Sequence, residues 1–257
     1  MYVHRIEFRC SAEQLLGRTA EFADELLGAL QQNGLVCEAE CSPVYLEGGS
    51  YVAIVLAPEQ MSFAPELHSE CVTKILGEGA ALGITVTFTA VAEDSSGEQT
   101  CACHSPSGYV LFTNFLSVAP PVRCLDCFLP VPLYRFPVRP AGDFHDVICW
   151  QSDYRSCDRL QMNCTVLEKA TTRQMSDVGS TLSKVGRENC SVLESLSGKP
   201  FYYYLYRANG RSVKSEMARC CPSCGQPWYL ETALHSLFHY KCDQCRLLSN
   251  FAWNLSP

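Results

Sequence analysis

The chain has 257 residues, of which 47% are hydrophobic and 18% are charged. This composition is typical of a folded globular protein and excludes a largely disordered chain. The longest apolar run, from Tyr51 to Ala57, is too short to cross a bilayer.

The cysteine content indicates the cellular compartment. The chain contains 17 cysteines, and its first residues, Met1 to Glu7, lack the apolar segment that a signal peptide requires. In a reducing cytosol, cysteine pairs hold metal ions more often than they form disulfides. We therefore expect a cytoplasmic protein with no membrane partner.

Charge is unevenly distributed along the chain. Residues 1–120 carry 4 Lys and Arg and 15 Asp and Glu, a net charge of −11. Residues 121–257 carry 16 Lys and Arg and 12 Asp and Glu, a net charge of +4. The acidic half would repel nucleic acid, whereas the second half could bind it. The acidic half also suits a basic protein partner, although a solvated surface that keeps the chain soluble explains it more simply.

The first 95 residues predict an α+β domain. Alternating apolar residues indicate strands at residues 2–9, 35–46, 51–57 and 84–90. Apolar residues at helical spacing indicate two helices, which begin near Ser11 and at Pro65. The order β-α-β-β-α-β predicts a ferredoxin-like domain, with an antiparallel four-stranded sheet and both helices on one face. This fold hosts many activities and therefore assigns none.

A cysteine-rich segment follows, and we expect a β-hairpin over residues 96–142. Cys101-Ala102-Cys103-His104 precedes an apolar strand, Tyr109 to Phe115, and then Cys124-Leu125-Asp126-Cys127. This pattern suits a hairpin that holds a second zinc ion through Cys101, Cys103, Cys124 and Cys127. Cys-x-Cys is less usual than Cys-x-x-Cys, and His104 could replace one cysteine of the first pair. The alternative is a plain hairpin with reduced, half-buried thiols.

Residues 143–199 predict an antiparallel pair of helices. The first helix covers residues 143 to about 164. In the second, apolar residues from Met175 to Leu196 recur at helical spacing, and Gly198 and Pro200 end the helix.

Residues 200–257 begin with a predicted strand at 201–206. Tyr202, Tyr204 and Tyr206 share one face of this strand, close to several basic residues. Such a row could stack unpaired bases and hold their phosphates. The alternative, which we favour, is a strand buried on both faces.

The last forty residues predict a zinc ribbon. Cys221-Pro222-Ser223-Cys224 and Cys242-Asp243-Gln244-Cys245 are separated by 17 residues, which suits two tight turns joined by a hairpin. Gly225 supplies the backbone freedom that such a turn needs. We predict a Zn²⁺ ion held by Cys221, Cys224, Cys242 and Cys245. Ordinary buried or disulfide-bonded cysteines are the alternative.

His235 and His239 offer a second ligand set together with Cys221 and Cys224. A two-Cys, two-His finger has about twelve residues between its second cysteine and first histidine. Only ten are present here, and the other two cysteines would have no role. Four thiolates fit better, and we expect both histidines to be surface or packing residues.

Several stretches are distinctive when taken together. They are RCLDCFLPVPLYR (123–135), WQSDY (150–154), LQMNC (160–164), RQMS (173–176), YYYLYR (202–207) and KCDQCRLLSN (241–250). From about residue 100 onward the chain resembles a bacterial zinc-ribbon-containing family of uncharacterised function, for which nucleic-acid binding has been suggested. The resemblance implies the same four ribbon ligands and covers much less of the front domain.

The sequence contains none of the common catalytic motifs. It lacks a glycine-rich phosphate loop, a Gly-x-Ser-x-Gly elbow and a His-Glu-x-x-His pair. Four thiolates also leave zinc no open position for an activated water. We therefore expect a non-catalytic zinc-ribbon recognition protein that binds nucleic acid and has no small-molecule substrate.

Two other functions stay open. The first is a protein-binding module, such as a toxin-neutralising immunity protein or an adaptor, that uses the acidic N-terminal half. The second is a zinc-dependent hydrolase or deaminase, which would require His104 to join the central cysteines in an open, three-ligand site.

Overall fold

The structure is a computed structural model that describes residues 1–10, 16–37, 43–46, 49–137 and 142–255. The chain divides into two compact units. Unit 1 comprises Met1–Thr100, Val118–Pro120 and Leu129–His145. Unit 2 comprises Cys101–Ser117, Pro121–Phe128 and Asp146–Pro257. No helix among the described residues is both long and apolar enough to cross a bilayer.

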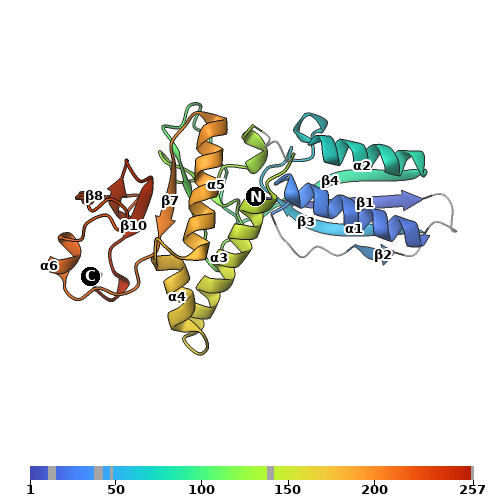
Figure 1. The fold of residues 1–257 in the computed structure, drawn as a ribbon. Coiled ribbons are helices and arrows are strands. Elements are labelled where there is room, and N and C mark those ends of the chain that lie inside the picture. The colour runs from blue at the N-terminus through green and yellow to red at the C-terminus, as the bar shows by residue number, and fades with distance from the viewer. Residues whose placement is uncertain (11–15, 38–42, 47–48, 138–141, 256–257) are drawn as a thin grey trace. The chain divides into compact units, whose positions relative to one another are not determined.

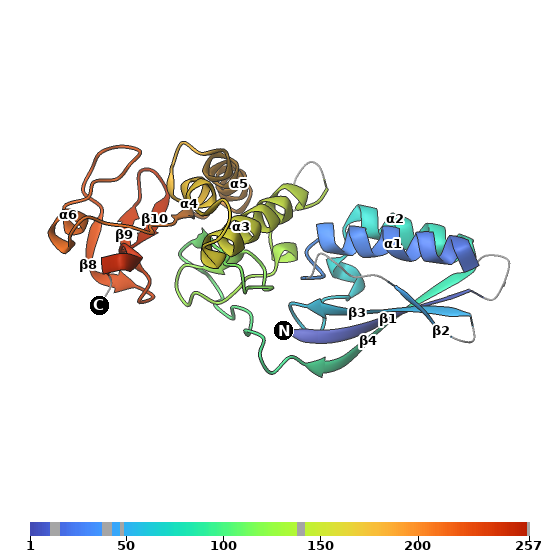
Figure 2. The same cartoon turned by 90° about the horizontal axis from the view of Figure 1, so that it is seen from below.

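Unit 1 has the element order that the sequence predicts. Its strands and helices are β1 (Tyr2–Cys10), α1 (Leu16–Gln32), β2 (Val44–Leu46), β3 (Ser50–Ala57), α2 (Glu70–Ala81) and β4 (Ile84–Glu93). The strands form one antiparallel sheet in the order β2-β3-β1-β4, and both helices lie on one face of it (Figure 2). Ile6 and Phe8 of β1 are fully buried together with Leu26 and Leu30 of α1, so the core lies between this face and the helices.

Some boundaries in unit 1 differ from the prediction. The second helix was expected from Pro65, but Pro65–Leu67 forms a short 3-10 turn and α2 begins at Glu70. The reason is a local cap: the Ser69 hydroxyl accepts the Val72 N–H at 3.3 Å. Of the strand expected at 35–46, the structure describes residues 35–37 and 43–46, and among these only β2 is a strand. The predicted helix cap at Ser11 lies outside the described residues.

Residues 96–142, expected as a single hairpin, are shared between the units. The stretch Leu129–His145 belongs to unit 1. The Tyr134 hydroxyl donates to Glu59 Oε2 at 2.8 Å and lies 3.0 Å from the Ser62 hydroxyl. The pKa of Tyr134 is raised, mainly by burial. Its hydroxyl therefore stays protonated and can donate the hydrogen bond to Glu59.

Unit 2 is built on one six-stranded sheet in the order β6-β5-β7-β10-β9-β8. The strands are β5 (Tyr109–Leu111), β6 (Val122–Cys124), β7 (Phe201–Leu205), β8 (Tyr229–Leu234), β9 (Phe238–Cys242) and β10 (Leu247–Asn250). Strand β7 pairs in parallel with both β5 and β10. The cysteine-rich hairpin and the ribbon, expected as separate domains, are therefore parts of the same sheet.

The helices of unit 2 are α3 (His145–Asn163), α4 (Glu168–Ser176), α5 (Thr181–Ser197) and the short α6 (Val213–Met217) (Figure 1). The second helix expected from Met175 is divided, because Ser180 caps a new helix by accepting the Ser183 N–H at 3.1 Å. Gly186 lets α5 approach β7 closely: a Cβ at this position would lie 2.3 Å from the Tyr203 ring.

Candidate metal centres and basic pocket

The structure brings together the four predicted ribbon ligands, Cys221, Cys224, Cys242 and Cys245, here called the C-terminal cysteine group. Their Sγ atoms all lie within 4.8 Å of one another, and those of Cys224 and Cys242 are 3.7 Å apart. Zinc–sulfur bonds of about 2.3 Å in a tetrahedron place the sulfur atoms about 3.8 Å apart. The donor set and spacing therefore fit a metal ion such as zinc.

The second group comprises Cys101, Cys103, Cys124 and Cys127, here called the central cysteine group. Its four Sγ atoms also lie within 4.8 Å of one another, so it too could hold a metal ion. Two sulfur atoms accept backbone N–H groups: Cys101 from Cys103 at 3.3 Å, and Cys124 from Asp126 at 3.4 Å. Such N–H donors favour the thiolate form that binds metal. At Cys101, however, burial is the larger effect and raises the pKa of the thiol.

The three Cys-x-x-Cys turns share one backbone feature. The residue after the second cysteine has a positive φ in each: 62° at Phe128, 75° at Gly225 and 53° at Arg246. Its N–H returns to the carbonyl of the first cysteine at 2.9 Å for Phe128 and at 2.8 Å for Gly225. A positive φ is uncommon outside glycine. The central group thus contains the same turn as the ribbon, although its sequence lacks the glycine that signals it.

The histidines considered as ligands have other partners. His235 Nε2 lies 2.7 Å from the Leu125 carbonyl oxygen, and the His235 ring stacks on Phe128 with centroids 5.0 Å apart. His239 Nδ1 lies 3.4 Å from the Phe251 N–H. His104 is exposed and belongs to neither cysteine group in the described part of the chain. A metal ion held by four thiolates would have no open position for a substrate or water.

The tyrosine row does not form an open stacking surface. Every residue of β7 is buried, and Tyr202 and Tyr204 expose only 3% and 5% of their surface. The Tyr202 hydroxyl donates to Asp243 Oδ1 at 2.5 Å, within the second ribbon turn. The Tyr204 hydroxyl donates to Asn250 at 3.0 Å. The strand is therefore buried on both faces, as the favoured alternative states.

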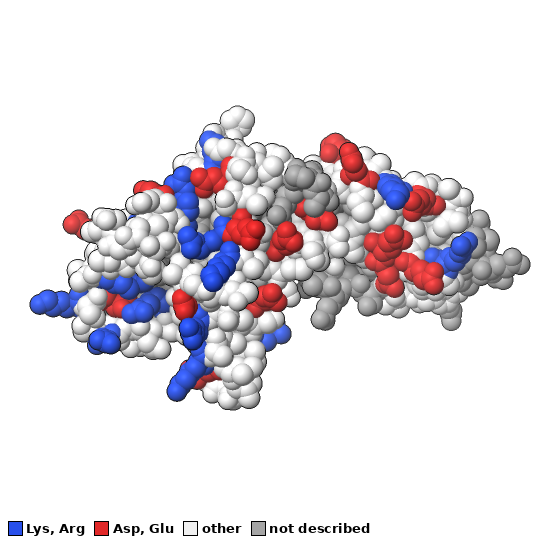
Figure 3. Space-filling model, viewed as in Figure 1, with Lys and Arg blue, Asp and Glu red and all other residues white. Residues whose placement is uncertain are grey.

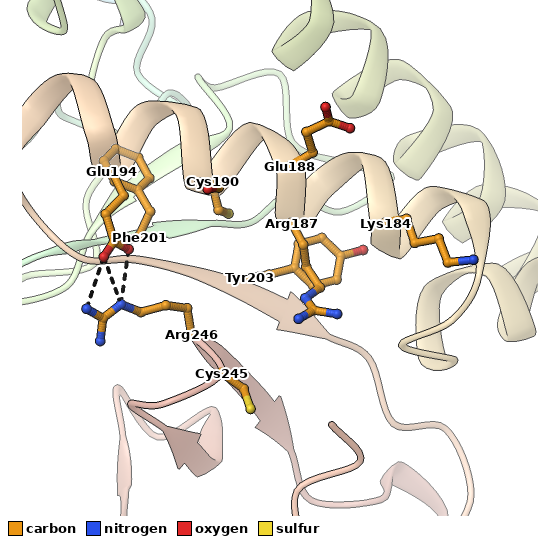
Figure 4. A pocket seen from close by; sticks show the side chains of 10 residues that line it. Lys184, Arg187, Glu188, Cys190, Glu194, Phe201, Tyr203, Cys245 and Arg246 are labelled. Carbon is orange, nitrogen blue, oxygen red and sulfur yellow. Dashed lines mark hydrogen bonds and ion pairs between the residues drawn. The ribbon is translucent and has the colours of Figure 1, made fainter. Parts of the chain in front are cut away.

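A pocket of about 420 Å³ lies between α5, β7 and the second ribbon turn (Figure 4). Its lining includes three basic side chains, from Lys184, Arg187 and Arg246. Arg246 is paired with Glu194, and this hydrogen-bonded pair lowers the pKa of Glu194 and raises that of Arg246. Glu188 also lines the pocket, although in Figure 4 its carboxylate lies on the opposite side of α5 from the Arg187 guanidinium. The pocket can therefore attract an anion through Lys184 and Arg187.

The two units differ in charge. Unit 2 contains 14 Lys and Arg and 11 Asp and Glu, whereas unit 1 contains 6 and 16. In Figure 3, Lys and Arg gather over the C-terminal elements of unit 2, and Asp and Glu predominate over the helices of unit 1. The charge difference is visible in the sequence, but the basic pocket is not, because Arg246 and α5 are about 50 residues apart in the chain.

These features define an α+β protein with two candidate metal centres in one sheet. Three family models match it, each described as a domain of unknown function: DUF8589 (residues 1–89), DUF2310 (103–206) and DUF8594 (210–255). A solved structure from Deinococcus radiodurans, provisionally named as an antibiotic biosynthesis monooxygenase, is 13% identical and has a TM-score of 0.30. It covers 39% of this chain and all of its own, and this similarity is too weak to carry an argument.

Two relatives come from Haemophilus influenzae, each named "Uncharacterized protein". One is 39% identical over 263 residues, which cover 99% of both chains. The other is 44% identical over 167 residues, which cover 65% of this chain and 82% of the relative. The chain belongs to the same bacterial protein family as these relatives.

Proposed function

We propose that this protein is a non-catalytic, zinc-binding recognition protein of the cytoplasm that binds nucleic acid through unit 2. Zinc is the metal that four thiolates in a tetrahedron favour. Because such a site is closed, the ions would stabilise the fold and take no part in chemistry. The ferredoxin-like unit 1 would not contact the nucleic acid, since its excess of Asp and Glu would repel phosphates.

The basic pocket carries this proposal. Lys184 and Arg187 lie three residues apart on α5, and Arg246 projects from the ribbon beside them. Cations gathered at a concave surface suit the phosphates of a nucleic-acid backbone, whose contacts supply most of the sequence-independent binding energy. The closed cysteine groups support a recognition role over catalysis.

Fluorescence anisotropy of labelled single- and double-stranded oligonucleotides, measured at increasing salt, tests the proposal. Binding should weaken steeply as salt rises. Replacing Lys184 and Arg187 together by Gln should lower the affinity and reduce the salt slope by about 2. Arg159→Gln with Lys169→Gln removes two exposed charges of unit 2 outside the pocket and serves as the control. An absence of binding, or an affinity that is flat in salt, would refute the proposal.

A second candidate is a protein-binding module, such as a toxin-neutralising immunity protein or an adaptor. One observation favours it: unit 1 combines its acidic surface with exposed apolar residues on its sheet, among them Val44 and Ile54, which expose 63% and 59% of their surface. A basic protein with an apolar contact patch would fit such a surface. Recovery of one stoichiometric protein from the native host, resistant to nuclease and to moderate salt, would favour this candidate.

A further inference from the structure

The ribbon contains a second, mainly apolar pocket of about 530 Å³. Four of its lining side chains are aromatic or imidazole rings, from Tyr229, His239, Phe251 and Trp253. Aliphatic side chains and methionine form most of the remaining wall. A ring-lined pocket of this size with few polar groups is typical of a binding site for a small organic group.

Trp253 is unusual among the tryptophans of the chain. It exposes 53% of its surface, whereas Trp150 and Trp228 expose 1% and 3%. Two pocket neighbours on α6, Val213 and Met217, are also about half exposed. An exposed indole beside a hollow costs hydration free energy in the free protein, and a ligand that covers it would recover that free energy.

The wall that carries Trp253 is held in place before any ligand binds. Asn254 Oδ1 accepts the Gly210 N–H at 2.8 Å, and Asn254 Nδ2 donates to the Gly210 carbonyl at 3.1 Å. A Cβ on Gly210 would lie 2.6 Å from a Leu255 methyl, so the two segments are in close contact. A preformed wall lowers the entropy lost on binding.

Basic residues next to the pocket indicate the chemical class of the ligand. Arg211 lies just before α6 and Lys214 lies in it, and both side chains are exposed. The same helix supplies the pocket residues Val213 and Met217. The nearby Glu216 does not offset them, because it is buried and paired with Arg207 and Arg219. Flat rings beside exposed cations are the combination that single-stranded nucleic acids require: bases stack on the rings, and phosphates pair with the cations.

We propose that this pocket binds an unpaired nucleobase of a single-stranded nucleic acid, with Trp253 as the stacking surface and Arg211 and Lys214 beside the adjoining phosphates. This inference rests on the proposed nucleic-acid function and specifies its ligand as a single strand. It also assigns base stacking to an exposed ring elsewhere in unit 2, because the tyrosines of β7 are buried and cannot stack bases.

The test uses full-length, zinc-loaded protein, a labelled oligothymidylate and a duplex of the same length. Stacking should quench the emission of the exposed tryptophan in the wild-type protein. Trp253→Leu should raise the Kd for the single strand by about 5- to 150-fold and leave the duplex Kd unchanged. Trp253→Phe, which keeps an aromatic face, should lose much less affinity. Leu116→Ala, a change at an exposed apolar residue of unit 2 outside the pocket, is the control.

The possible results distinguish a failure of this inference from a failure of the proposed function on which it rests. If the wild-type protein binds the single strand without quenching, or if Trp253→Leu binds it normally, the pocket is not a base site although the proposed function stands. If Trp253→Leu and Trp253→Phe weaken single-strand binding equally, an aromatic face at this position does not carry the affinity, and the inference fails. If the wild-type protein binds neither strand type, the proposed function and this inference fail together.

Discussion

Arg246 and Glu194 connect the ribbon to helix α5. Arg246 donates from Nε and from Nη2 to the two carboxylate oxygens of Glu194, each at 3.0 Å. The residue before Arg246 is Cys245 of the C-terminal cysteine group, so this ion pair attaches the second ribbon turn to the helix that lines the basic pocket. A metal ion held in the ribbon would thereby help to fix the pocket's shape.

Glu194→Gln should lower the free energy of unfolding by about 1 kcal/mol, because it removes the charge from a bidentate pair that is one-third exposed. The pair lowers the pKa of Glu194, so its contribution is present above the unfolded-state pKa near 4.5. That contribution is lost as pH falls through the lower, folded-state pKa. Urea unfolding at several pH values measures this effect. Glu188→Gln, on the exposed side of α5, is the matched control, and equal losses in both variants would contradict the assignment.

His235→Ala should make the thiols of the central cysteine group more accessible to alkylating reagents. The imidazole contacts the Leu125 carbonyl inside the Cys124–Cys127 turn, and we expect its loss to cost about 1–2 kcal/mol. Alkylation during chelator treatment, followed by peptide mass spectrometry, should find Cys124 and Cys127 modified sooner than in wild type. His239→Ala alters a histidine that contacts Leu237 and Phe251 within the ribbon, and it should leave that rate unchanged. No acceleration in His235→Ala would show that the contact is not stabilising.

Cys221→Ser and Cys124→Ser should each release one zinc ion and destabilise the whole of unit 2, because both cysteine groups are attached to one sheet. Loss of a zinc ligand removes binding free energy that is also folding free energy. Unit 1 has its own buried core and should stay folded. Limited proteolysis is expected to leave a stable fragment of about the first 100 residues. A Cys221→Ser protein that kept its melting profile and both ions would show that the site is wrongly assigned.

Asp158→Asn should stabilise the protein, and by more at higher pH. Asp158 is 9% exposed, and burial raises its pKa although its Oδ2 accepts the Phe115 N–H at 2.8 Å. A carboxyl whose pKa is higher in the folded state destabilises the fold above that pKa and ceases to do so as pH falls. Asn keeps the acceptor without the charge. The gain in unfolding free energy over wild type should therefore grow as pH rises from the unfolded-state pKa near 3.8 through the raised folded-state pKa, and then level off. A difference that does not change with pH would be evidence against this explanation.

The sequence predicts local features well and distant pairings poorly. The four ribbon ligands are recognisable because each Cys-x-x-Cys turn is set by a few consecutive residues, and the β-α-β-β-α-β order of unit 1 follows from hydrophobic periodicity. The parallel pairing of β5 with β7 joins residues about 90 positions apart, and no local pattern encodes it. For the same reason the sequence did not reveal the contact between His235 and Leu125, or either pocket.

The burial of β7 shows a different limit of sequence analysis. Alternating tyrosines fit a strand with one open face as well as a strand covered on both faces, because a tyrosine ring can be buried while its hydroxyl finds a partner. Here Asp243 and Asn250 accept the hydroxyl hydrogen bonds of Tyr202 and Tyr204. Only the three-dimensional arrangement of unit 2 distinguishes the two cases.

The zinc content of the purified protein tests the central claim most directly. Native mass spectrometry of protein purified without added metal should show two zinc ions per chain, with both cysteine groups protected from alkylation. Cys101→Ser and Cys242→Ser should each reduce the count to one. Protein that is folded and free of zinc, or whose eight cysteines react freely with alkylating reagent, would contradict a fold built on two metal centres and the recognition surface derived from it.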